Sequence, residues 1–279
     1  MSKELCDLIN VANNYVFDDP NNPGEYDSTH LLKVAFPKKD CGSDDQKLTS
    51  SFIALLTLIN DNNNINNENL EGDKLVEYAI LWLSYKLNQK KKNRTIIFNE
   101  FYTKDIEKNS CYNQKITDNS DKKINKDVIK NKIKSMDIDI KDISNFYDAF
   151  KSLCNMYNEI VADDDQCNKC LESAGELFEK YEKLKNDLDI NKGSSYYQLL
   201  SSLSNDYKNF EKKYNVKCKN TSSLVACPRS SIIKNTLIPI AIIFVVASFF
   251  FGISYKVNNK EFKKIYYIYI NINEQPYAS

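Results

Sequence analysis

The sequence predicts an all-α protein, in which a disulfide-bonded helical ectodomain is followed by one C-terminal transmembrane helix. Apolar residues recur at helical spacing, and no segment before the C-terminal region alternates with period two. A long uncharged run lies near the C-terminus, and all eight cysteines precede it. The predicted parts are an ectodomain over residues 1–215, a juxtamembrane stalk over 216–231, a transmembrane helix over 232–255 and a short tail over 256–279.

The overall composition indicates a folded domain with a polar surface. The mean hydropathy of −0.52 is low, but 18 Tyr and 14 Phe argue against disorder. Lys+Arg and Asp+Glu are both 38, so the chain carries no net charge. Because there is no basic stripe, zinc-finger spacing or helix-turn-helix pattern, no nucleic-acid partner is expected.

The N-terminal region mixes a short helix with turns. Residues Ser2 to Asn10 suit an opening helix with one apolar side. The stretch Asp18 to Asp27 is rich in turn residues, because two prolines and a glycine interrupt it. Met1 to Val16 lacks the apolar core of a secretory signal, so the C-terminal span is expected to act as both targeting signal and anchor.

The helical pattern strengthens from Asp45 onward, where the first apolar stripe predicts a helix to Ile59. The Asn-rich stretch Asn60 to Asn69 predicts a solvated loop, with a prion-like segment as the alternative. Lys74 to Asn88 is apolar almost all round, which predicts a central helix with Trp82 as a core anchor. The basic run Lys90 to Arg94 suits a helix C-terminus, and an acidic partner is the alternative.

The second half of the domain continues the same pattern. A loop is predicted over residues 109–121, and helices over 95–108, 122–134, 140–161, 166–187 and 195–214. The ectodomain is therefore expected to contain about seven helices.

The uncharged run Asn235 to Tyr255 is the strongest single signal. As a helix it would be about 31 Å long, which matches a hydrocarbon core of about 30 Å. Four lysines and one glutamate follow it closely, whereas Arg229 and Lys234 precede it. The positive-inside rule favours a cytosolic tail and an exported N-terminal domain.

The cysteines point to the same topology. They are Cys6, Cys41, Cys111, Cys154, Cys167, Cys170, Cys218 and Cys227. An even number on one side of a membrane span is typical of disulfides in an oxidising space, and buried free thiols are the alternative. The pairing cannot be read from the sequence.

Motifs for chemistry are weak throughout. The pair Cys167 and Cys170 lacks the thioredoxin or zinc-site context, so each is expected to bond to a distant cysteine. His30 has no partner motif for catalysis, and Asp163 to Asp165 suit a helix cap. Asn93 and Asn220 open short glycosylation sequons. No catalytic, cofactor-binding or metal residue is predicted, and no enzymatic activity or cofactor is expected.

Five segments in order resemble the PIR (interspersed repeat) multigene family of malaria parasites, in its rodent-parasite branch. The resemblance covers residues 1–256, and its segments are Tyr78 to Asn88, Asn145 to Asn158, Cys167 to Leu184, Tyr196 to Tyr207 and Leu237 to Lys256.

The resemblance implies a variant surface antigen or host-interaction protein of infected red cells, acting by binding or immune modulation and not by catalysis. It implies a single-pass protein in infected-erythrocyte or vacuolar membranes, with the N-terminal domain outside the parasite cytosol. Its expected partners are the membrane and a host cell-surface protein or antibody, and its oligomeric state stays open. The alternative is a structural or remodelling protein of vacuolar or exported parasite membranes.

The tail departs from the family pattern. Relatives continue into a short basic tail, whereas Lys256 here precedes a run rich in Lys, Asn, Ile and Tyr. Our hypothesis is that this tail is a gene-model artefact, which sequencing of the transcript across Lys256 would test.

Overall fold

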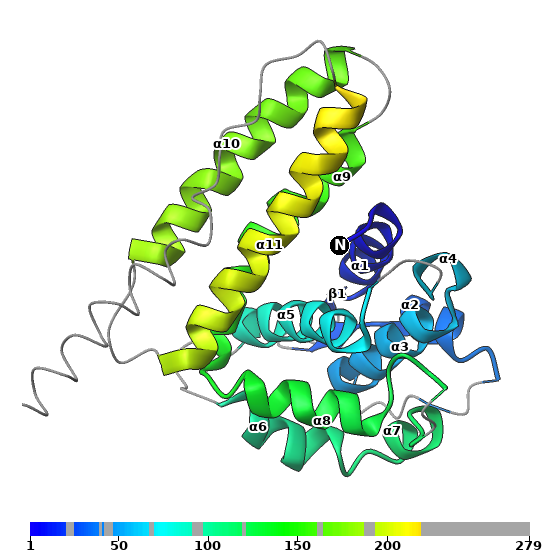
Figure 1. Cartoon of the computed structure of the whole chain (residues 1–279). Helices are drawn as coiled ribbons and strands as arrows, with labels where there is room; N and C mark the ends of the chain where they lie inside the picture. The colour runs from blue at the N-terminus through cyan, green and yellow to red at the C-terminus, as the bar shows by residue number, and fades with distance from the viewer. Residues whose placement is uncertain are drawn as a thin grey trace, which may run out of the picture. The chain divides into compact units, whose positions relative to one another are not determined.

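The computed structural model describes residues 1–20, 25–38, 41, 47–66, 70–90, 97–118, 121–160, 164–186 and 193–218 (Figure 1). The chain divides into two compact units, Met1–Cys227 and Pro228–Ser279. The predicted transmembrane helix and tail lie outside the described residues. Within the described ranges, no helix combines the length and apolar character needed to cross a membrane.

Two long helices form the centre of the domain. Helix α5 (Gly72–Lys90) packs against helix α9 (Ile140–Glu159). Tyr78 of α5 stacks on Phe150 of α9, with ring centroids 4.9 Å apart. Trp82 is fully buried, which confirms its prediction as a core anchor. Such aromatic pairs add about 0.5–1.5 kcal/mol beyond the burial of apolar area, so this contact strengthens the packing of α5 on α9.

The other long helices surround this centre and lie close to their predicted positions. They are α1 (Lys3–Tyr15), α3 (Lys47–Asp61), α8 (Lys126–Ser135), α10 (Asp164–Asn186) and α11 (Gly193–Lys217). Figure 1 shows α10 and α11 running alongside α9. Two of these helices are longer than predicted, because α1 continues to Tyr15 and α11 extends into the predicted stalk.

Several short elements were not predicted by periodicity. Strands β1 (Phe17–Asp18) and β2 (Tyr26–Asp27) pair antiparallel in the turn-rich stretch. Helix α6 (Phe98–Phe101) and the π-helix η2 (Tyr102–Ile106) together cover most of the helix predicted over residues 95–108. The short helices that were not predicted are α2 (Thr29–Ala35), α4 (Asn63–Asn66) and α7 (Ser110–Lys115). Each spans at most two turns, which is too short to show a periodic apolar face.

The predicted loops at residues 60–69 and 109–121 are therefore partly wrong, because asparagine side chains start helices there. The side-chain oxygen of Asn62 accepts hydrogen bonds from the backbone N–H groups of Asn64 and Ile65. Asn109 does the same for Cys111 and Tyr112. A capping side chain satisfies backbone donors that a helix end leaves open, so Asn-rich sequence here encodes capped turns.

The segment around Lys123 is fixed by two close backbone contacts. The side chain of Asn60 is buried, donates to the carbonyl of Ile124 at 2.7 Å and accepts from its N–H at 3.1 Å. A Cβ added at Gly72 would lie 1.7 Å from the carbonyl oxygen of Lys123. Only glycine therefore allows the start of α5 to approach this backbone.

Candidate binding surface

A partly buried ionic network joins α5, α8 and α11. The ammonium group of Lys74 lies 3.0 Å from carboxylate oxygens of both Glu77 and Asp206, and the hydroxyl of Ser202 contacts Lys74 and Glu77. Lys132 on α8 lies 3.1 Å from the other oxygen of Glu77. The Glu77 and Asp206 side chains are only 8% and 4% exposed. Each buried carboxylate therefore faces a cation, as burial of charge requires.

The start of α1 is attached to the same network. The N-terminal amine of Met1 lies 3.8 Å from Asp206. Ser2 caps α1 by accepting from the N–H of Leu5 at 3.2 Å, and a disulfide joins Cys6 to Cys154 of α9. The first turn of α1 is thereby fixed beside the C-terminal half of α9.

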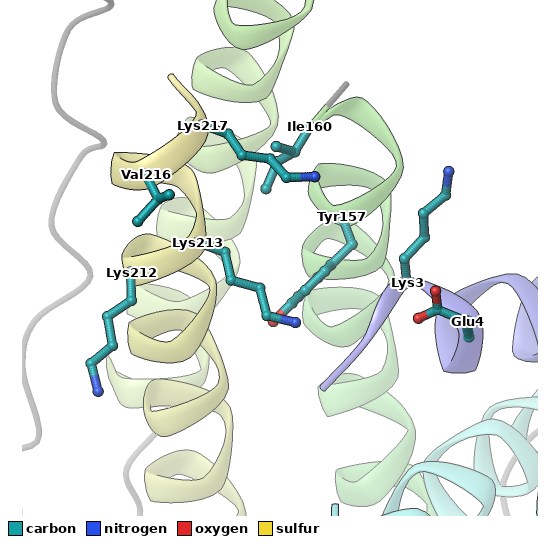
Figure 2. Close-up of a pocket in the computed structure, with 8 residues that line it drawn as sticks. All are labelled: Lys3, Glu4, Tyr157, Ile160, Lys212, Lys213, Val216 and Lys217. Atoms are coloured by element: carbon teal, nitrogen blue, oxygen red, sulfur yellow. The ribbon is translucent and has the colours of Figure 1, made fainter. Parts of the chain in front are cut away.

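A groove of about 490 Å³ lies between α1, the end of α9 and the last turns of α11 (Figure 2). The apolar residues of its lining are Tyr157, Ile160 and Val216. Tyr157 is 4% exposed, whereas Val216 is 68% exposed. The apolar part of the lining therefore ranges from a buried aromatic ring to a solvent-exposed aliphatic side chain.

Positive charge dominates this groove. The described lining residues include one carboxylate, Glu4, and four lysines, which are Lys3, Lys212, Lys213 and Lys217. Figure 2 shows Lys213 and Lys217 directed into the groove from α11, Lys3 on the opposite side, and Lys212 pointing away. The ammonium group of Lys213 lies 5.3 Å from the centroid of the Tyr157 ring. Such a contact contributes about 0.5–1 kcal/mol at an exposed site and limits the motion of the side chain.

The structure pairs six of the eight candidate cysteines. The disulfides are Cys6–Cys154, Cys41–Cys111 and Cys167–Cys218. Cys227 lies outside the described residues. Within the described residues Cys170 is a buried free thiol, and its bond to a distant cysteine stays a prediction. One helical turn separates it from Cys167, and the cysteine that reaches this face from α11, Cys218, bonds to Cys167.

The environment of Cys170 makes it a poor nucleophile. Burial raises the pKa of its thiol to about 12, and the negative charge of Glu159 contributes in the same direction. The thiol therefore stays protonated at neutral pH, whereas the reactive form of cysteine is the thiolate.

The remaining motifs lie apart from the groove or outside the described residues. His30 lies in the first turn of α2, and its ring centroid is 4.5 Å from that of Tyr15. Of the acidic triplet, Asp164 begins α10 and Asp163 is outside the described residues. The basic run from residue 91 and both sequons are outside them too. Among described side chains, no group of three His, Cys, Asp or Glu could hold a metal ion.

Sequence reasoning missed the groove as a site. The lysines of α11 fall within six residues, which is a visible signal, but a charge run on a helix is usually a solvated face. Lys3 is distant in sequence, and the core packing of α1, the Cys6–Cys154 disulfide and the contact of Met1 place it beside the groove.

Comparison with known proteins confirms the resemblance. A family model described as Plasmodium variant antigen protein Cir/Yir/Bir matches residues 6–256. A solved structure, titled "Structure of a Plasmodium PIR protein ectodomain", aligns with a TM-score of 0.61 and 32% identity over 81% of this chain and 96% of that one. No curated protein matches the chain. Since the family model spans most of the chain, the chain belongs to the Plasmodium variant antigen family Cir/Yir/Bir.

Proposed function

We propose that this chain is an exported variant surface antigen of malaria-infected red cells, which binds host molecules through its helical ectodomain and performs no catalysis. One span over residues 232–255 anchors it, with the ectodomain outside the parasite cytosol. The observation that carries this proposal is the family match over residues 6–256, which includes the helical domain and the uncharged run together.

The disulfides support the proposed side of the membrane. Three disulfides join parts of the chain that are distant in sequence, with separations of 148, 70 and 51 residues. Disulfides persist in oxidising spaces and are rare in the cytosol. The ectodomain is therefore suited to an exported position, where host proteins and antibodies are the partners we propose.

Protease treatment of intact infected cells tests this function. An antiserum against the ectodomain should detect loss of the full-length band after trypsin treatment, while a parasite cytosolic protein stays intact. An antiserum is used in place of an N-terminal tag, because Met1 is only 5% exposed and its amine faces Asp206.

Full protection until the cells are permeabilised would contradict the surface role. It would instead favour the alternative, a structural or remodelling protein of vacuolar or exported parasite membranes. Protease treatment of cells in which only the red-cell membrane is permeabilised would distinguish vacuolar membranes from exported membranes.

A further inference from the structure

We propose that the groove between α1, α9 and α11 binds a sulfated glycan chain. The inference rests on the proposed function, because it requires the ectodomain to face host glycans. It adds the chemical class of ligand and the residues that hold it, which are Lys3, Lys213 and Lys217, with Lys212 at the outer edge.

The charges in the groove suit a polyanion. Lys213 and Lys217 reach in from α11, while Lys3 lines the groove from α1 on the other side, with its side chain directed away from α11 (Figure 2). Cations on both sides of an open groove suit an extended chain that carries several negative groups. A single carboxylate could meet only part of this set. The lining presents lysine ammonium groups. An ammonium group acts as a point charge and can pair with a sulfate group without the planar, two-point hydrogen bonding that arginine makes.

Helix-dipole effects account for only part of this cluster of lysines. Lys213 and Lys217 lie near the C-terminus of α11, where the helix dipole favours cations. Lys3, however, is the first residue of α1, where the dipole disfavours a cation. The fold nevertheless fixes this helix start beside the other lysines, through the Met1–Asp206 contact and the Cys6–Cys154 disulfide.

One cation is also partly positioned before binding. Lys213 lies over the Tyr157 ring, and Tyr157 is held in the core by an edge-on contact with Phe210, with ring centroids 4.9 Å apart. A side chain that is already ordered loses less conformational entropy when a ligand binds. The groove thus combines open access, opposed cations and a partly fixed ammonium group.

The test measures binding of the full-length chain, in a neutral detergent, to immobilised heparin. The variant Lys213→Gln/Lys217→Gln should weaken binding about 2- to 30-fold, as expected for the loss of two exposed charge pairs. The matched control is Lys130→Gln/Lys134→Gln, which removes two exposed lysines at the same i, i+4 spacing on α8 and should change affinity less than twofold. Glu4→Gln removes the carboxylate from the lining and should strengthen binding.

Four further measurements test the chemistry of the ligand. Chemically desulfated heparin should lose binding, and Lys213→Arg/Lys217→Arg should retain it. Rising salt should weaken heparin binding by the wild type more steeply than binding by the Lys213→Gln/Lys217→Gln variant. The variant makes fewer charge contacts, so fewer counterions are released when it binds. Phosphatidylcholine vesicles that contain anionic phosphatidylserine should not compete with heparin.

Equal losses in the groove variant and the α8 control would overturn the proposal, as would absence of heparin binding or full competition by the vesicles. These outcomes are independent of the proposed function. A chain that is protease-sensitive on intact cells but does not bind heparin retains its surface role and loses only the glycan site.

Discussion

The ammonium group of Lys74 on α5 lies 3.0 Å from a carboxylate oxygen of Asp206 on α11, although 132 positions separate the two residues. Burial alone would lower the pKa of Lys74, but the nearby carboxylates of Glu77 and Asp206 outweigh it and raise that pKa. The pair stabilises the fold below the unfolded pKa of lysine, and this stabilisation is lost as pH rises through the raised folded pKa.

Removing the carboxylate of Asp206 should strongly destabilise the domain. Asp206→Asn leaves Lys74 and the Met1 amine without this counter-charge, and breaking a buried pair costs about 3–5 kcal/mol. Urea denaturation of the wild type and variant at pH 7 measures the loss. Asp148→Asn is the control, because Asp148 is exposed on α9 and its loss should change stability by less than about 0.5 kcal/mol. Equal effects of the two changes would show that the network adds little stability.

The long helices could be predicted from sequence because burial on one face leaves a periodic record. Helices α5, α9, α10 and α11 were each predicted within about three residues at either end. Short elements leave no such record, since Asn62 and Asn109 stabilise α4 and α7 through local hydrogen bonds. The groove is lined by Lys3 and Lys213, which are distant in sequence, and the Cys6–Cys154 pairing that helps to place α1 beside α9 cannot be read from the sequence.

The pH dependence of stability should carry a signature of Lys86. This side chain is 5% exposed, and its ammonium group donates to the carbonyl oxygens of Val16 at 2.7 Å and Asn13 at 3.3 Å. Burial lowers its pKa to about 8, and Asp18 opposes this shift. Between pH 8 and the unfolded pKa of about 10.4, the unfolded chain holds more protons. This group's contribution to stability therefore rises with pH over that window.

The comparison with Lys86→Met isolates this contribution from other titrating groups. The free energy of unfolding of the wild type, minus that of the variant, should rise from pH 7 to pH 9.5 in urea denaturation. The range stops there because burial raises the pKa of Tyr26, whose ionisation in the unfolded chain then lowers stability near pH 10. A difference that is flat across the range would contradict the lowered pKa.

The Cys6–Cys154 disulfide should control the order of α1. Both cysteines are buried, so Cys6→Ala/Cys154→Ala removes the bond without burying a polar group. The loss of stability should be about 2–4 kcal/mol, because the bond closes a long loop in the unfolded chain. Amide hydrogen exchange should accelerate over Lys3–Tyr15 more than over α5. Unchanged exchange in α1 would show that the Met1–Asp206 contact and core packing hold the helix without the bond.

Thiol labelling should distinguish the native state of Cys170 from its unfolded state. Burial raises its pKa to about 12, so iodoacetamide at pH 8 should leave Cys170 unmodified in the native chain. Labelling in urea without reductant should modify it fully, and peptide mass spectrometry identifies the site. Rapid native labelling would contradict its burial in α10. Absence of labelling in urea would mean that Cys170 is disulfide-bonded, so this experiment tests directly whether the sequence-based pairing or the free thiol is correct.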